Sequence, residues 1–249
     1  MKQNLTNKTF FLVKRYFNLN IGPHVLRCPY FQNVRMITKL PVFVGKGLPE
    51  EIEKETLKLF KNNQKNLIKL DPQSVRQYMV MGGLGIDCSG FVARILDSLL
   101  NERHLGGIVK NIKPENTSLI SLLKHYIRTF TNLSADTLTS YKNCVEIKEF
   151  DEVIPGDLIR AGYGHVAIIT KVDKVNRKTK CITYCHSTYD YLDESGVRQG
   201  NILIINPNKP LEKQRWDEHY LGRNWMLEDY FNAKSDERGI RRLKVFQNI

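Results

Sequence analysis

The sequence lacks any apolar stretch long enough to cross a membrane. Near the N-terminus, the apolar run over residues 10–13 ends at Lys14 and Arg15. A secretory signal needs about 7–15 apolar residues followed by a small-residue cleavage site, and the sequence shows neither. The expected compartment is therefore the cytoplasm, with export or release by a non-standard route as the alternative.

Acidic residues are absent from the first 49 positions, and the first one is Glu50. The whole chain has 38 Lys and Arg against 26 Asp and Glu, a net charge of +12. Eight of those basic residues lie before Glu50, so most of the net charge belongs to this segment. We expect residues 1–49 to be a basic segment that docks to an anionic polymer or a membrane surface, beside a nearly neutral domain over 50–249.

The usual cysteine patterns of disulfide-bonded or zinc-binding proteins are also missing. The five cysteines are odd in number, and none forms a C-x-x-C pair. Cys181 and Cys185 lie in a predicted strand, which would separate their Cα atoms by about 13 Å, too far for a disulfide. We therefore expect free thiols, with no bound metal and no cofactor.

The order of predicted elements indicates an α+β fold. With 249 residues and 41% hydrophobic residues, the chain is long and apolar enough for a sizeable core without disulfides. Helical periodicity comes first, alternating strand patterns follow from residue 153, and residues 102–150 form a mixed, polar insertion between them. The predicted helices cover residues 50–68, 71–78, 88–101, about 119–130 and 211–233, and the predicted strands cover 157–160, 165–172, 181–186 and 197–205.

Cys88 is the candidate nucleophile. It stands at the start of the most strongly apolar helix, after a glycine-rich turn and beside Asp87, a good N-cap residue. The free N–H groups of a helix N-terminus favour a thiolate and can bind the oxyanion formed on an attacked carbonyl. A lone cysteine in a helix is more often a buried structural residue, so this interpretation depends on partners elsewhere in the chain.

Two histidines supply those partners. His165 begins the strong strand HVAIITKV, and His186 ends the strand CITYCH that follows a turn near residues 175–179. The hairpin brings both to the same end of the sheet. An imidazole base with a second polar group to orient it is the arrangement that activates a nucleophilic thiol.

These motifs resemble the NlpC-type cell-wall cysteine peptidases, which have a papain-like fold. The resemblance rests on DCSGFV at residues 87–92, PGDLI at 155–159, GHVAI at 164–168 and the strand that ends in His186. It implies an α+β core with the nucleophile at a helix N-terminus packed on an antiparallel sheet. By position it implies Cys88 as nucleophile, His165 as base and His186 as third polar residue, and assigns Asp87, Ser89 and Tyr78 to substrate binding.

The implied chemistry is covalent acyl transfer that cleaves an amide bond, with a peptide or peptidoglycan stem-peptide fragment as substrate. A Cys88 thiolate paired with protonated His165 would attack the carbonyl, and water would release the acyl group. Two alternatives stay open. The first is a thiol transferase that uses the same residues to move an acyl group to an amine. The second is a catalytically inactive papain-like basic protein that binds an anionic polymer.

Overall fold

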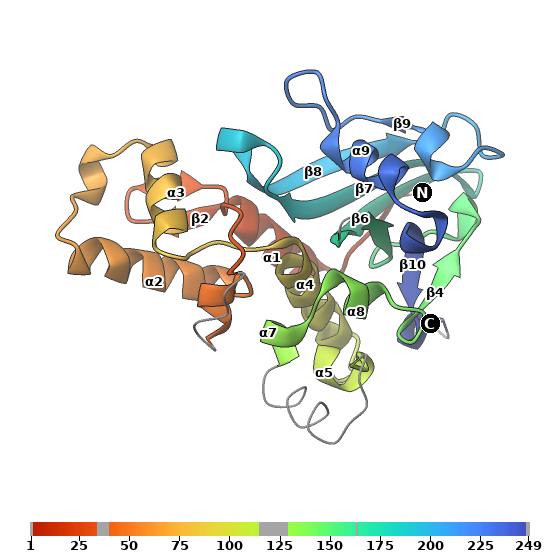
Figure 1. Cartoon of the computed structure of the whole chain (residues 1–249). Helices are drawn as coiled ribbons and strands as arrows, with labels where there is room; N and C mark the ends of the chain where they lie inside the picture. The colour runs from red at the N-terminus through yellow and green to blue at the C-terminus, as the bar shows by residue number, and fades with distance from the viewer. Residues whose placement is uncertain (1, 34–39, 115–128, 163, 248–249) are drawn as a thin grey trace.

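The protein has a mixed α+β architecture around an antiparallel sheet, which confirms the predicted class (Figure 1). The computed structural model describes residues 2–33, 40–114, 129–162 and 164–247. Within them an eight-stranded sheet has the order β4-β10-β5-β6-β7-β8-β9, with β1 paired to β6, and β2 and β3 form a separate pair. The strands are β1 (Lys2–Asn4), β2 (Leu19–Ile21), β3 (His24–Leu26), β4 (Cys144–Ile147), β5 (Leu158–Ala161), β6 (His165–Val175), β7 (Lys178–Thr188), β8 (Gly196–Leu203), β9 (Arg215–Trp216) and β10 (Gly239–Leu243).

Most helices precede the sheet in the chain. The sequence correctly predicted the three that lead to the candidate site, each with a proline or an aspartate at its start: α2, α3 and α4. The described helices are α1 (Asn7–Phe17), α2 (Pro49–Asn62), α3 (Pro72–Met81), α4 (Cys88–Glu102), α5 (Gly107–Asn111), α7 (Thr129–Asn132), α8 (Ala135–Thr139) and α9 (Trp225–Asn232). Most of the helix predicted near residues 119–130 lies outside the described residues.

Strands β6 and β7 form the predicted hairpin. Val175 pairs with Lys178, so the turn consists of Asn176 and Arg177, both with positive φ. Two positive φ angles in a two-residue loop match the right-handed twist of the flanking strands. The tight turn fixes the register, and register determines which face of the sheet each later side chain occupies.

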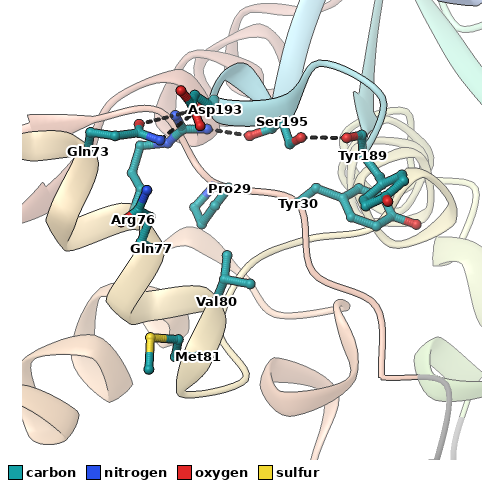
Figure 2. Close-up of a pocket in the computed structure, with 10 residues that line it drawn as sticks. All are labelled: Pro29, Tyr30, Gln73, Arg76, Gln77, Val80, Met81, Tyr189, Asp193 and Ser195. Atoms are coloured by element: carbon teal, nitrogen blue, oxygen red, sulfur yellow. Dashed lines mark hydrogen bonds between the residues drawn. The ribbon is translucent and has the colours of Figure 1, made fainter.

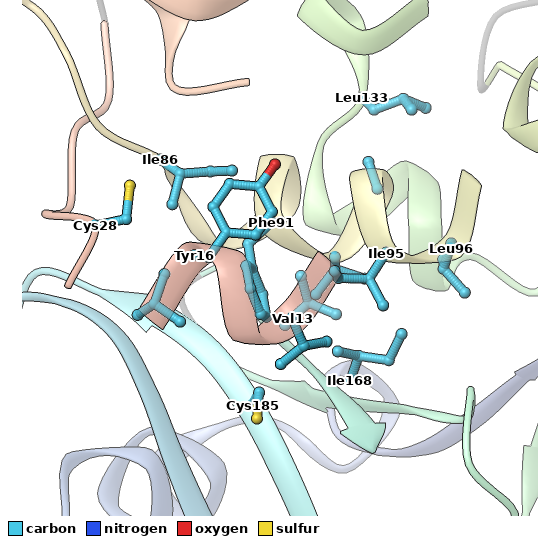
Figure 3. Packing of buried hydrophobic residues seen from close by; sticks show 14 of the residues in the cluster. Val13, Tyr16, Cys28, Ile86, Phe91, Ile95, Leu96, Leu133, Ile168 and Cys185 are labelled. Atoms are coloured by element: carbon cyan, nitrogen blue, oxygen red, sulfur yellow. The ribbon is translucent and has the colours of Figure 1, made fainter. Parts of the chain in front are cut away.

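The sheet separates two groups of buried side chains. Residues that alternate along one strand belong to different groups: Ile168 packs with α1 and α4, whereas Ala167 and Ile169 pack on the face that α9 covers. Figure 3 shows the first group, in which the ring of Tyr16 meets that of Phe91 edge-on at 5.4 Å. Helix α4 therefore lies against β6 and β7, the two strands that carry the candidate histidines.

The basic N-terminal residues belong to the same core as the rest of the chain. Strand β1 pairs with β6, and Tyr16, Leu19 and Ile21 are fully buried in the group that contains α4. Residues on both sides of the boundary proposed between positions 49 and 50 pack into this one core. A docking role for the segment stays a prediction.

The prediction of one long helix over residues 211–233 is wrong. That stretch contains the short strand β9, then irregular backbone, and becomes helical only at Trp225. Leu221 and Gly222 both have positive φ, which interrupts a helix. The aromatic residues suggested a single helix, but Trp216 and Tyr230 belong to two different elements that pack on the same face of the sheet.

In the part of the chain that the structure describes, no helix is both long and apolar enough to span a membrane. Both described ends of the 102–150 insertion pack onto the core, the first through Ile108 and Ile112 and the second through Leu133 and Leu138. Whether the insertion acts as a lid stays a prediction.

Candidate functional site

Cys88 is the first residue of α4, as predicted. Asp87 caps the helix, because its carboxylate accepts a hydrogen bond from the Gly90 N–H at 2.6 Å. Among the described residues, no acceptor is recorded for the N–H group of Cys88, whereas the Ser89 N–H interacts with the Cys88 sulfur. One backbone donor is thus free beside the thiol, and an oxyanion site requires such donors.

A buried ion pair lies under this helix start. The Lys46 ammonium donates to the carboxylate of Asp87 at 2.7 Å, to the hydroxyl of Ser89 and to the Leu133 carbonyl at 3.1 Å. Asp87 and Ser89, both predicted to bind substrate, are 4% and 6% exposed. Their polar atoms therefore serve Lys46 and the helix cap, and their exposed surface is small.

The two histidines lie on one face of the β6–β7 hairpin. Ile168 and Cys185 are paired and share one face of the sheet. His165 precedes Ile168 by three positions and His186 follows Cys185 by one. Because side chains alternate along a strand, both histidines lie on the face opposite to that of Ile168 and Cys185. The Nε2 of His165 and the Nδ1 of His186 are 2.7 Å apart. The predicted contact between the two rings is present.

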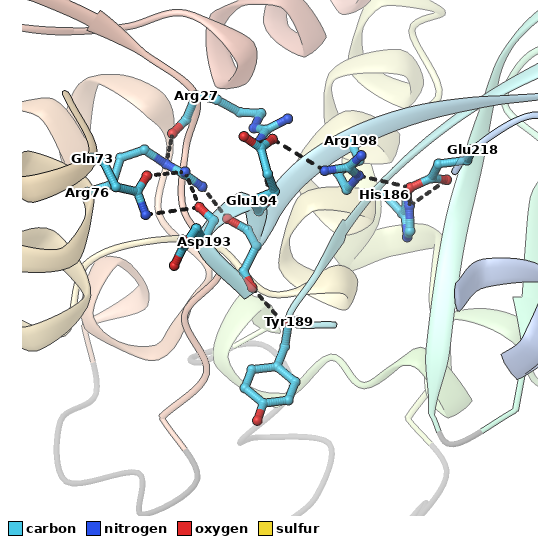
Figure 4. A network of polar contacts seen from close by, with 10 residues as sticks. Arg27, Gln73, Arg76, His186, Tyr189, Asp193, Glu194, Arg198 and Glu218 are labelled. Atoms are coloured by element: carbon cyan, nitrogen blue, oxygen red, sulfur yellow. Dashed lines mark hydrogen bonds and ion pairs between the residues drawn. The ribbon is translucent and has the colours of Figure 1, made fainter. Parts of the chain in front are cut away.

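Glu218 extends this pair. Its carboxylate accepts from His186 Nε2 at 2.9 and 3.0 Å, and from Arg198 Nε at 3.2 Å (Figure 4). Burial opposes ionisation of Glu218, but His186 and Arg198 outweigh it and lower the pKa of the carboxyl to about 2. A buried carboxylate therefore anchors the two histidines, and the sequence did not predict it.

The Cys88 thiol contacts the residue immediately before strand β6, which begins at His165. The Cys88 Sγ donates to the carbonyl of Gly164, the residue before His165, at 3.7 Å. Among the described residues, no hydrogen bond joins that sulfur to the His165 ring. The structure brings Cys88 to the start of β6 without the direct thiol–imidazole contact that we expected.

The protonation states differ from the predicted thiolate–imidazolium pair. Burial raises the pKa of the Cys88 thiol to about 12, Asp87 adds to this effect and Lys46 opposes it. Burial lowers the pKa of the His165 imidazole to about 3, with a further decrease from His186. The ion pair is therefore disfavoured at rest, because desolvation penalises both charged forms.

Two separate hollows are lined in part by residues 29–33. Backbone hydrogen bonds join Pro29 and Phe31 to Ile86, two positions before Cys88. One hollow, of about 470 Å³, has Tyr30, Val80 and Tyr189 in its wall (Figure 2). The other, of about 500 Å³, contains Cys88, with more polar side chains around it: Gln32, Asn33, Lys46, Asp87, Ser89, Thr131, Asn132, Ser134, Asp136.

Tyr78, predicted to bind substrate, lines neither of these two hollows. Its ring packs on Phe60 at 4.7 Å, and the Lys65 ammonium lies 5.3 Å from the ring centroid. Tyr30 lies near the thiol instead. Burial raises the pKa of Tyr30, and the adjacent charges of Cys88 and Asp87 raise it further.

Sequence reasoning missed Glu218, Lys46 and Tyr30, each for a different reason. Glu218 lay within a stretch interpreted as a helix, and Lys46 within a basic segment interpreted as a docking surface. Tyr30 lay between Pro29 and Phe31 with no periodic pattern. The only sequence feature that indicated a packed rather than an exposed Lys46 was the pair of glycines beside it, Gly45 and Gly47. Gly45 has a φ of +74°, and a side chain there would collide with the Phe31 carbonyl, so close packing was encoded at that point.

No group of three or more His, Cys, Asp and Glu side chains that could hold a metal ion is found among the described residues. No family model matches this sequence, and no match was found to a curated protein or to a solved structure. The resemblance to NlpC-type peptidases therefore rests on the motifs alone.

Proposed function

We propose that the protein is a thiol-dependent hydrolase that cleaves an amide bond, with Cys88 as nucleophile and His165 as general base. One observation carries the proposal. A thiol at the first residue of a buried helix lies against the residue before His165, while His165 is hydrogen-bonded to His186. The start of the helix that carries the proposed nucleophile thus contacts the chain immediately before the strand that carries the proposed base.

The reaction begins from a neutral thiol and a neutral imidazole. His165 Nε2 is occupied by His186, which leaves Nδ1 to take the Cys88 proton as the sulfur attacks the carbonyl carbon. The free N–H group of Cys88 then donates to the oxyanion. His165 returns the proton to the leaving nitrogen, the C–N bond breaks and a thioester forms on Cys88.

Water completes the cycle. His165 Nδ1 takes a proton from water and the hydroxide attacks the thioester. The C–S bond then breaks and His165 passes its proton to the sulfur, so the products are the free thiol and a carboxylic acid. In the transferase alternative, an amine replaces the water and a new amide forms.

The substrate we propose is a stem peptide of peptidoglycan, and the fold we propose is papain-like with added helices. Both come from the resemblance to NlpC-type peptidases. The hollow of about 500 Å³ that contains Cys88 supports a peptide substrate, because it is large enough for a small peptide segment and its wall offers several polar side chains.

Docking to an anionic polymer or membrane surface belongs to the same proposal. Lys2, Lys8 and Lys14 are exposed on β1 and α1, and the first 49 residues contain no acid to offset them. Positive surface charge of this kind attracts anionic partners and weakens with added salt.

A catalytically inactive binding protein is the second candidate. The pKa of about 12 for the Cys88 thiol favours it, because a thiol that stays protonated is a poor nucleophile. The two candidates differ in whether any covalent product forms on Cys88.

Purified protein incubated with muropeptides, followed by mass spectrometry, tests the proposal. We expect cleaved stem peptides from the wild type and none from Cys88→Ala, with the same thermal melting curve for both. Cleavage that survives in Cys88→Ala would refute the assignment of the nucleophile. Absence of cleavage in both, together with retention of muropeptide or polyanion, would favour the binding protein.

A further inference from the structure

We infer that Glu218 is a positioning residue that sets the tautomers of His186 and His165 and so keeps Nδ1 of His165 free to accept a proton. The catalytic importance of that nitrogen rests on the proposed function, whereas the tautomers themselves do not. Glu218 belongs to none of the sequence motifs described above.

Glu218 is held as a buried anion. It is 2% exposed, and its carboxylate receives hydrogen bonds from His186 and Arg198. Arg198 in turn lies 3.8 Å from the ring centroid of Tyr191 and 3.5 Å from the carboxylate of Glu194. A guanidinium is always charged in proteins, so Arg198 gives the carboxylate a permanent counter-ion.

An ionised carboxylate only accepts hydrogen bonds, so His186 Nε2 must be the donor to Glu218. The direction of the bond between the two histidines then follows for the state in which His186 is neutral. His186 Nε2 must carry a hydrogen to donate to Glu218, so neutral His186 has a lone pair on Nδ1. His165 Nε2 must then carry a hydrogen to donate to that lone pair across 2.7 Å. Neutral His165 is left with its own lone pair on Nδ1.

The opposite order would disable the base. If His186 carried its hydrogen on Nδ1, it would donate to His165 Nε2, and neutral His165 would carry its hydrogen on Nδ1. That nitrogen could not take a proton from the thiol. Replacing the carboxylate with an amide favours this order, because Arg198 attracts the amide oxygen and leaves the NH₂ group to face His186.

Nitrogen-15 NMR of the two imidazoles at pH 9, well above the ordinary pKa of an imidazole, tests the inference without any substrate. In the wild type we expect protonated Nε2 and unprotonated Nδ1 on both His165 and His186. In Glu218→Gln we expect the majority of both rings to shift to the Nδ1-protonated form. Glu218→Asp keeps the charge and should retain the wild-type tautomers.

Glu212→Gln is the matched control, because Glu212 also pairs with an arginine, Arg238, at 3.1 Å, but lies outside the histidine network. It should leave both tautomers unchanged. Wild-type His165 protonated on Nδ1, or unchanged tautomers in a folded Glu218→Gln, would overturn the inference. If Glu218→Gln does not fold, the wild-type spectrum still decides.

Kinetics separate this inference from the proposed function. If muropeptides are cleaved, Glu218→Gln should lower kcat by roughly 10²–10⁴-fold, the range for general-base catalysis, with KM little changed. Glu218→Asp should recover part of the loss. An equal loss of kcat in Glu212→Gln would contradict a specific role. If the protein cleaves nothing, the proposed function fails, while the NMR result still stands or falls on its own.

Discussion

At the scale of single residues, Cys88 lies between opposing electrostatic effects. The helix start and Lys46 favour the thiolate, whereas burial and Asp87 oppose it more strongly. Because Lys46 is already paired with Asp87, its charge is largely offset before it reaches the sulfur. Motif and helix position predicted the location of the nucleophile but not its protonation state.

Alkylation of Cys88 by iodoacetamide should report that state. With a pKa raised to about 12, the thiol is neutral at pH 6, so the rate at Cys88, followed by peptide mass spectrometry, should rise with pH above 8. Lys46→Gln should lower the rate at pH 9 by roughly tenfold, since one unit of pKa changes the thiolate fraction tenfold.

The control for this substitution is Lys58→Gln, which removes an exposed ion pair with Glu55 and should leave the rate unchanged. A plateau of rapid alkylation between pH 5 and 7 would instead show that the thiolate–imidazolium pair exists at rest.

Residue types at motif positions were predictable, and their partners were not. Cys88, His165 and His186 carry local signals: a capped helix start, a strand start and a strand end. Glu218 reaches His186 from a loop 32 positions away, and Lys46 reaches Asp87 across 41 positions. Tyr78 shows the converse, because its position in the motif suggested a role that its packing on Phe60 does not support.

At the scale of elements, the start of α4 is defined by a close approach of two backbones. Gly90 lies in the first turn of the helix, directly against the carbonyl of Gly45 and the side chain of Lys46. The periodicity of the helix predicted the element itself. Only the structure reveals that the glycine is there to let residues 45–46 pack against the helix.

Gly90→Ala should therefore destabilise the protein, although alanine is the better helix former by about 1 kcal/mol. The added Cβ would overlap the Gly45 carbonyl oxygen, and relieving such a clash costs about 1–3 kcal/mol. We expect a lower free energy of unfolding in urea. Asn101→Ala, an exposed position in the same helix, is the control and should not destabilise. A more stable Gly90→Ala would contradict the close approach.

At the scale of the whole molecule, the positive charge and the core overlap in sequence. The N-terminal segment supplies eight basic residues, but it also supplies Tyr16, whose ring is fully buried and whose hydroxyl donates to the Gly47 carbonyl at 2.8 Å. Charge counts could not predict this, because they take no account of the apolar positions of α1. A truncation that removes residues 1–39 should therefore unfold the protein rather than leave a reactive domain.

Substitutions at Tyr16 test that conclusion more gently than a truncation. Tyr16→Ala should lower the free energy of unfolding by about 3–5 kcal/mol, as for large aromatic side chains in a core. Tyr16→Phe should lower it by about 1 kcal/mol, for one buried hydrogen bond. Phe11→Ala, at a 62% exposed position on the same helix, should have little effect. Equal effects at positions 11 and 16 would mean that α1 is not part of the core.

The pairing of β1 with β6 also has a consequence for synthesis on the ribosome. Lys2 pairs with Asp173, and the Val197 N–H donates to the Cys28 carbonyl. The N-terminal residues are therefore synthesised long before the residues with which they pair. Until the β6–β7 hairpin emerges, the apolar faces of α1 and α4 have no sheet to cover them. Contacts of such long range form slowly and leave apolar surface exposed meanwhile. Nascent chains shorter than about 200 residues should therefore depend on chaperones, even though the finished protein buries the same surface completely.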